Sequence, residues 1–452
     1  MITLLLLALK GTAQSYPDFK SLRYDEDYSF LQNDTLKDNA YKSLKFTPLD
    51  KSGNTNIGFG GDLRYQYFYE KNGNWGDAPV DNDGYVLGRF LLHTDFHTGD
   101  FFRAFLQIQG SSADSRMDPS PVDSNPLEVH QAFLDIILMR SAGNKLTLRT
   151  GRQELSYGSQ RLVSVREGPN NRQSFDALKL MAVKGNYAAD FFYSHYVVAS
   201  DGIFDDDSNA KRQFWGSYFQ INKVPAIKNV DLYYFGYHRE NAFFDDGQGT
   251  EKRHSVGTRL SGRYGNWRYD AEAVYQFGSL EEKEISAWTA SINTGYQFST
   301  IPFHPEIGIK GEVISGDRQI GDHQLGTFNP LFPRGGYFGL ASLIGPSNLI
   351  DFHPSLNLEI SKNIEWIIDY DMFWRHSTND GLYAPSGAMI YPTGTSDSRK
   401  IGNQIESEIV FQPNQYLYFR LEATWFAAGD YIKQSGPGKD IFFAGTTVQL
   451  RF

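Results

Sequence analysis

An arginine-rich segment between residues 151 and 172 is the part of this sequence best suited to bind a charged ligand. It begins with GRQELSYG at 151–158 and continues through Arg161, Arg166 and Arg172. A guanidinium group donates paired hydrogen bonds to a carboxylate, so these arginines suit an anionic ligand. They can equally form ion pairs with the nearby acids Glu154, Glu167 and Asp176. Both interpretations stay open at the level of sequence.

Sequence motifs for catalysis or for metal binding are absent or weak. The chain has no cysteine, which excludes disulfides, zinc-thiolate sites and cysteine nucleophiles. It contains no nucleophile elbow, P-loop or HExxH motif, so we expect no enzyme activity and no cofactor. His93, Asp95 and His97 alternate as metal ligands would, but a channel lining or rim explains them more simply. Acid-rich fragments at 81–84 and 205–207 resemble parts of calcium loops, so loop calcium stays open.

Composition narrows the class of protein. The 452 residues carry 43 Lys and Arg against 53 Asp and Glu, a net charge of -10, which argues against nucleic-acid binding. Aromatic residues make up 15%, far too many for a disordered chain. After the short apolar run at 2–9, no stretch reaches the roughly 20 apolar residues that a membrane helix needs.

Alternation of apolar and polar side chains predicts eighteen strands, most of about 9 to 14 residues, a length that suits tilted membrane-crossing strands. The expected segments are 57–68, 84–97, 100–110, 127–140, 144–153, 174–184, 187–197, 213–222, 229–239, 251–264, 266–278, 284–298, 304–315, 350–360, 363–375, 399–411, 415–427 and 440–452.

The connections between these segments alternate between short and long, except at the short 279–283. This layout is typical of an outer-membrane barrel with tight periplasmic turns, long extracellular loops and both termini in the periplasm. Strands in hydrocarbon must satisfy their hydrogen bonds by closing into a ring. The sequence therefore predicts an all-β fold, an 18-stranded antiparallel transmembrane β-barrel of the outer membrane. The longest loop, 316–349, is expected to form a folded extracellular cap that is able to enter the mouth.

The alternation also predicts which face each side chain occupies. Tyr and Trp on the apolar parity, for example Tyr65, Trp366 and Trp425, suit the interfacial girdles of a barrel. The other parity should line a wet lumen of mixed charge. Its basic members are Arg64, Arg89, Arg103, Arg149, Arg259, Arg263, Arg268, Lys310, Arg375 and Arg420. Its acidic members are Asp62, Asp95, Asp270, Glu272, Glu306, Glu312, Glu359, Asp369, Asp371, Glu406, Glu408 and Glu422.

Three regions follow from these patterns. Residues 1–13 resemble a secretory signal peptide that lacks its usual basic start, 14–56 form a periplasmic segment, and 57–452 form the barrel. The last segment ends in Phe452 with apolar residues at alternate positions, like the C-terminal signal that bacterial barrels present to the assembly machinery. We expect outer-membrane lipid and that machinery as partners, and periplasmic export partners stay open.

An ordered set of motifs resembles the alginate export family of outer-membrane barrels. The set comprises LRYDEDY at 22–28, GGDLR at 60–64, GRQELSYG at 151–158, TFNPLFP at 327–333, YFG at 337–339, FWR at 373–375 and DGLY at 380–383. The resemblance spans nearly the whole chain after the signal.

The resemblance implies an eighteen-stranded channel that exports an anionic exopolysaccharide, alginate in the named members, through an arginine-rich constriction. Carried over to this sequence, Arg152, Arg161 and Arg172 are the first candidates for that constriction. Arg149 and Arg152 lie three apart, so both can point inward only if a bulge interrupts the strand near Gly151. The remaining candidates for substrate binding are Arg149, Arg103, Arg89, Arg259, Arg263, Lys310, Arg375 and Arg420. The rival function is a diffusion porin for small anions or oligosaccharides on the same barrel, and a barrel without transport would need a filled lumen.

Overall fold

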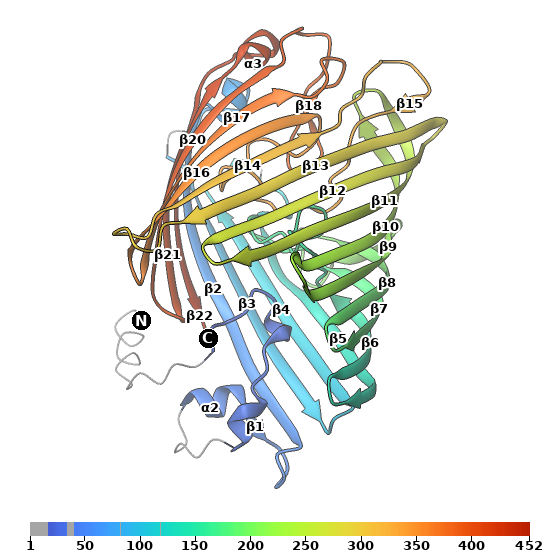
Figure 1. Ribbon diagram of the computed structural model, residues 1–452, viewed down its shortest axis with the longest axis vertical. Coiled ribbons are helices and arrows are strands. Elements are labelled where there is room, and N and C mark those ends of the chain that lie inside the picture. Colours follow the sequence, from blue (N-terminus) through green and yellow to red (C-terminus); the bar gives the residue numbers. More distant parts are fainter. Residues whose placement is uncertain (1–16, 34–39, 82, 118) are drawn as a thin grey trace.

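Eighteen antiparallel strands close into a single barrel (Figure 1). The computed structural model describes residues 17–33, 40–81, 83–117 and 119–452. Each barrel strand pairs with the next one along the chain, and β2 pairs with β22, which places Tyr65 opposite Val448. The strands are β2 (Thr55–Lys71), β3 (Tyr85–Thr98), β4 (Phe102–Asp114), β5 (Asn125–Ser141), β6 (Asn144–Gln153), β7 (Phe175–Lys184), β8 (Tyr187–Val198), β9 (Asp207–Val224), β10 (Lys228–Phe244), β11 (Gly247–Tyr264), β12 (Trp267–Leu280), β13 (Lys283–Gln297), β14 (Glu306–Ile314), β16 (Leu349–Ser361), β17 (Ile364–Arg375), β20 (Lys400–Asn414), β21 (Leu417–Ala428) and β22 (Ile441–Arg451).

Short elements complete the described chain. The N-terminal part holds the 3-10 turns η1 (Arg23–Asp25) and η2 (Ser29–Asn33), the helix α2 (Ala40–Lys45) and β1 (Thr47–Pro48), which pairs with β2. The connections hold η3 (Gly73–Gly76), β15 (Gln324–Leu325), β18 (Leu382–Tyr383), β19 (Met389–Tyr391) and α3 (Asp430–Ser435). The expected signal peptide, 1–13, lies outside the described residues.

The two faces of the wall follow the predicted parity. Along β2, Leu63 and Tyr65 are exposed on the outer face, whereas Asp62, Arg64 and Gln66 are buried on the inner face. A charged side chain on the lipid-facing midplane costs roughly 2–4 kcal/mol for Lys or Arg, so only the inner face tolerates these charges. Apolar residues therefore face outward, and polar residues line the lumen.

The barrel has two unlike ends. One end, here called the terminal end, holds Phe452, α2 and the turns 99–101, 142–143, 185–186, 225–227, 265–266, 298–305, 362–363 and 415–416. The opposite end, here called the loop end, holds the connections 72–84, 115–124, 154–174, 199–206, 245–246, 281–282, 315–348, 376–399 and 429–440. In Figure 1 the C-terminus and α2 lie toward the lower left, whereas α3, β15 and β18 lie along the upper edge.

The prediction of one long connection is wrong. Residues 240–250, rich in Asp and Gly, were expected to form a long connection, but β10 and β11 run through them and leave only 245–246 as the turn. A bulge between Arg239 and Ala242 shifts the register, so the alternation breaks where a strand continues. Ala242 and Phe244 are buried against Leu280 and Leu325, and this packing stabilises the extended strands.

Candidate functional site

Two connections of the loop end fold inward and fill that half of the lumen. They are 154–174, between β6 and β7, and 315–348, between β14 and β16. Backbone hydrogen bonds join them, from Ser164 N to Phe332 O and from Phe332 N to Leu162 O, both 2.9 Å. The ring of Phe332 packs edge-on against Phe175 and Phe214 of the wall, with centroids 4.9 and 5.0 Å apart. The 315–348 connection thus is a folded cap, as expected, and it reaches into the barrel mouth.

Three arginines converge on one carboxylate of the 154–174 loop. Arg89 Nη2 lies 2.5 Å from Glu167 Oε1, Arg64 Nη1 lies 3.4 Å from the same oxygen, and Arg172 Nη1 lies 3.3 Å from Oε2. Arg64 also donates to the carbonyls of Glu167 and Pro169, at 2.7 and 3.0 Å. The arginine side chains are at most 4% exposed, but that of Glu167 is 44% exposed. We call this group the Glu167 cluster; its three buried arginines meet at one carboxylate that is open to the lumen.

Two buried acids balance the remaining charge of the Glu167 cluster. Asp62 lies 3.5 Å from Arg89, and Glu154 lies 2.8 Å from Arg172. His130 also contacts Glu154, at 2.8 Å. Buried charges persist only when paired, so these two acids hold the arginines in place. Glu167 is the one acid of the group that an incoming anion could replace, since it alone is largely accessible.

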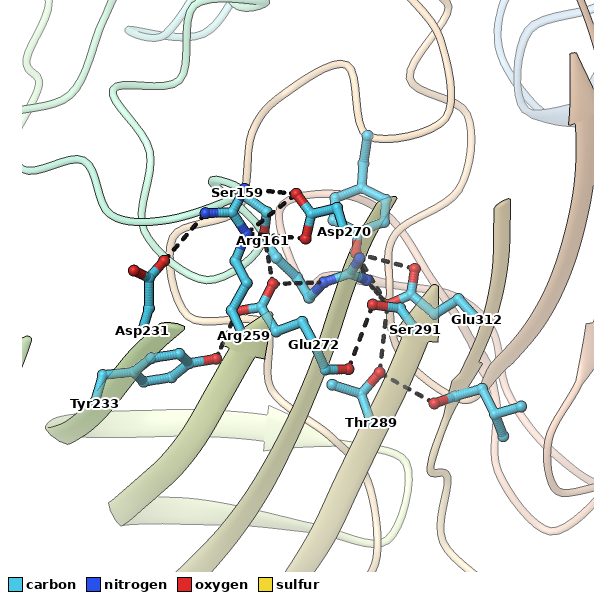
Figure 2. Close-up of polar contacts among 12 residues, drawn as sticks. Ser159, Arg161, Asp231, Tyr233, Arg259, Asp270, Glu272, Thr289, Ser291 and Glu312 are labelled. Carbon is cyan, nitrogen blue, oxygen red and sulfur yellow. Dashed lines mark hydrogen bonds and ion pairs between the residues drawn. The ribbon is translucent and has the colours of Figure 1, made fainter. Parts of the chain in front are cut away.

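The 154–174 loop is also fastened to the far wall (Figure 2). Arg161 contacts Glu272 at 3.3 Å and also binds Glu312 and the Tyr337 hydroxyl. Ser159 Oγ donates to Glu272 at 2.5 Å. Because Glu272 belongs to β12 and Glu312 to β14, this loop spans the lumen from the β6–β7 side to the opposite strands.

The wall beside Arg161 pairs its own charges. Arg259 of β11 lies 2.5 Å from Asp270 of β12 and 3.1 Å from Asp231 of β10 (Figure 2). Tyr233 donates to Glu272 at 2.6 Å. These contacts join neighbouring strands and stabilise the wall. They explain part of the mixed charge that was predicted for the lumen.

The N-terminal segment enters the lumen from the terminal end. The Tyr24 ring packs against Phe105 and Phe133, with centroids 6.0 and 5.5 Å away, and is 6% exposed. Arg149 Cζ lies 4.6 Å from the centroid of the Tyr24 ring, and Arg103 Nη2 donates to Tyr24 O at 2.6 Å. The segment therefore covers two arginines that the sequence assigned to the lumen. LRYDEDY was recognised as a motif before the barrel, but no periodicity placed it inside.

Cavities remain between this segment and the wall. One of about 550 Å³ is lined by the N-terminal segment together with Arg103, Arg149 and Lys145. A second of about 220 Å³ lies deeper and touches Tyr24, Lys179 and Asp190. Acidic and basic side chains line both cavities in equal number, so the accessible space of the terminal half is polar and of mixed charge.

The expectation that Arg152 points into the lumen is wrong. Pairing runs without interruption across Gly151, with Arg149 opposite Asp135 and Arg152 opposite Asp176. Arg149 is buried on the inner face, so strand alternation turns Arg152 to the outer face near the loop end. Arg152 Nε lies 2.9 Å from Asp176 there. Without a bulge, only one of the two arginines can face inward.

The other expected site residues are paired as well. Arg149 and Arg103 each bind an aspartate with two nitrogens, at 2.6 and 2.8 Å to Asp135 and at 2.7 and 2.8 Å to Asp95. Longer contacts join Arg263 to Glu306, Lys310 to Asp351 and Arg420 to Glu408, at 3.4, 3.8 and 3.5 Å. Among the candidates, all within the described chain, only Arg375 has no ion pair.

Arg375 is the last residue of β17, at the loop end. It donates to the carbonyls of Ser396 and Ser398, at 2.7 and 2.6 Å, and its guanidinium lies 3.8 Å from the Tyr431 ring centroid. Its side chain is fully buried. We therefore assign Arg375 a structural role. The described lumen holds no continuous track of unpaired cations.

Comparison with known proteins assigns the chain to a family. No helix of the described residues is long and apolar enough to cross a membrane. A family model for alginate export matches residues 55–441, which covers the barrel from β2 to the start of β22. The chain belongs to the alginate export family. Family and fold together identify an outer-membrane channel, and no curated protein matches the chain.

Solved structures share the fold of this alginate export family member at low identity. A BenF-like porin from Pseudomonas fluorescens Pf-5 has a TM-score of 0.59 and 10% identity, covering 88% of this chain and 98% of that one. OpdK of Pseudomonas aeruginosa, solved with vanillate, has a TM-score of 0.57 and 11% identity, with 88% and 98% covered. OccK2 of the same species, solved with glucuronate, has a TM-score of 0.57 and 12% identity, with 87% and 98% covered.

Proposed function

We propose that this channel carries an anionic exopolysaccharide of the alginate type from the periplasm, at the terminal end, to the cell surface, at the loop end. The Glu167 cluster is the observation that carries the proposal. A polyuronate offers one carboxylate per sugar, and each can take the place of Glu167 among Arg64, Arg89 and Arg172. The family match supports the same substrate class.

For a polymer to pass, the inward loops must leave the lumen. Glu167 is tied by side-chain ion pairs, not by the barrel's backbone ladder, so an incoming carboxylate exchanges one set of charge-assisted bonds for another. The contacts of Arg161 with Glu272 and Glu312 must break for the 154–174 loop to leave the lumen. Conduction requires such modest, replaceable contacts, because a site that binds too tightly retains its ligand.

A diffusion porin for small anions or oligosaccharides is the second candidate. The cavities of about 550 and 220 Å³ favour it, since they hold small solutes in the terminal half of the lumen; passage through the loop end still needs the inward loops to move. OccK2 was solved with glucuronate and OpdK with vanillate, both small carboxylates, although these barrels share only the fold with this chain.

Planar-bilayer recording tests the proposal. We expect anion preference under a KCl gradient and a current that oligouronates reduce more strongly as their length increases. A neutral oligosaccharide of matched length should have little effect. Arg89→Gln with Arg172→Gln should abolish the oligouronate effect, whereas Lys211→Gln, at an exposed lysine paired with Glu240, should preserve it.

The outcomes separate the candidates. Block by monomeric uronate that does not grow with chain length supports the porin. Cation preference without any oligomer effect contradicts both functions and leaves only the barrel fold.

A further inference from the structure

Four oxygen-bearing side chains meet at the loop end, outside the lumen sites described above. Glu128 and Asn125 come from the start of β5, and Asp205 and Asp206 come from the connection 199–206. One carboxylate oxygen from each of the three acids lies within 4.8 Å of the other two. Glu128 and Asn125 are 2% and 1% exposed, Asp206 is half-buried and Asp205 is exposed.

The backbone brings these residues together. Phe204 N donates to Leu127 O at 3.0 Å, and Asp205 N donates to Glu128 Oε1 at 2.5 Å. Asn125 Nδ2 donates to both oxygens of Asp206, at 2.9 and 3.1 Å. The 199–206 connection therefore crosses the ends of β6 and β7 to reach β5, and its acids are held against the wall.

The charge of this group is not balanced by an ion pair. None of Glu128, Asp205 and Asp206 forms an ion pair with a described Lys, Arg or His, unlike the acids of the Glu167 cluster. Arg152 lies beside the group, but its Nε and Nη2 both donate to the Asp176 carboxylate, and Nη2 contacts Asp206 at the backbone oxygen, at 3.1 Å. Three carboxylates at this spacing repel each other unless a cation lies between them.

A second observation points to a ligand. Asn125 Oδ1 is buried and has no hydrogen-bond partner, although its carboxamide faces the Asp206 carboxylate. A buried amide oxygen without a partner is costly. Turning the carboxamide by half a rotation directs this oxygen at Asp206, where a cation bound by both groups satisfies it.

We propose that Glu128, Asp205, Asp206 and Asn125 bind a calcium ion. The donors are all oxygen, which suits a hard cation and disfavours zinc or copper. Calcium accepts six to eight oxygens in flexible geometry, and carbonyls or water can complete such a shell, whereas magnesium demands near-ideal octahedral geometry. The ion would join the 199–206 connection to β5.

Calorimetry on the purified, EDTA-treated full chain tests this site. We expect CaCl₂ to bind at one saturable site and MgCl₂ to bind at least tenfold more weakly. Glu128→Gln and Asp205→Asn should each weaken calcium binding at least tenfold. Asp205 is exposed, so its substitution leaves the barrel intact even if Glu128→Gln disturbs it. Glu282→Gln, an exposed loop-end acid outside the group, should bind as the parent does.

The same samples give a second measurement. Calcium should raise the unfolding temperature of the parent and of Glu282→Gln but not that of Asp205→Asn. Absence of saturable calcium binding to the parent, or equal binding in the parent and both substituted chains, overturns the proposal. Equal affinity for magnesium overturns the preference for calcium.

Discussion

Arg23 ties the N-terminal segment to the seam of the barrel by donating to the carbonyl of Phe452 at 2.8 Å. Its other terminal nitrogen donates to Gly61 O at 3.0 Å, so one guanidinium contacts both β2 and the residue that follows β22. Glu26 pairs with the same side chain at 2.7 Å. The segment that places Tyr24 in the lumen is thus anchored at a fixed point of the wall.

Removing this anchor should open the terminal half of the lumen. We expect deletion of residues 17–33 to raise single-channel conductance roughly twofold or more, because the Tyr24 ring no longer narrows the path. Arg23→Ala should give a smaller rise with more frequent transitions between levels. Phe30→Ala is the control, since Phe30 is 44% exposed. Unchanged conductance in the deletion would mean that ions pass elsewhere.

Glu167→Gln should strengthen anion binding. The substitution removes the accessible acid that faces Arg64, Arg89 and Arg172, so it raises anion selectivity and lowers the oligouronate concentration for half block. Stability should also fall, by about 3 kcal/mol, because the buried Arg64 loses its acidic partner. Reversal potentials and block curves measure these effects against Glu282→Gln. Weaker block in Glu167→Gln would contradict carboxylate exchange.

Arg149→Ala and Arg152→Ala should differ sharply, although the two residues are three apart. Arg152 faces outward, so its loss should leave selectivity unchanged. Arg149→Ala strips the buried Asp135 of its two-nitrogen partner and should destabilise the barrel by about 3–5 kcal/mol while reducing anion preference. Denaturant unfolding and reversal potentials compare the two. A larger selectivity change in Arg152→Ala would require a different orientation of β6.

Asp317 should make the loop-end cap sensitive to pH. Burial, together with the charges of Asp380 and Asp246, raises the pKa of Asp317 from 3.8 to about 7. Below pH 3.8 the carboxyl is protonated in both the folded and the open cap. Between the two values only the folded cap keeps the proton, so its stability falls as pH rises to about 7 and stays low above it.

Asp317→Asn removes that dependence, because an amide is neutral at every pH. Limited proteolysis within 315–348 at about pH 5 and about pH 8 should show equal protection in the variant and lower protection at the higher pH in the parent. Asp322→Asn, on the same connection, should behave as the parent, since its Oδ1 accepts from Gln324 N. Greater protection of the parent at the higher pH would contradict the assigned protonation.

The sequence was enough to predict three features of the barrel: the number of strands, the face that each side chain occupies and the alternation of short and long connections. Each of these depends on residues that are neighbours in the sequence. Period-two alternation decides the face of Leu63 or Arg64 without any tertiary contact. Alternation failed at 240–250, where a bulge breaks the period. At Arg152 alternation was right, and the motif resemblance, which was followed in its place, was wrong. The inward position of Tyr24 and Glu167 could not be predicted, since it depends on contacts such as Arg89 with Glu167, between residues far apart in the chain.

The pairing of β2 with β22 has a consequence for biosynthesis. Because the ring is sealed by its final strand, a chain that stops early by even that one strand keeps two unsatisfied edges, each a template for intermolecular pairing. Translation must therefore finish before the fold can be completed, and incomplete products should be aggregation-prone substrates for proteolysis rather than smaller pores.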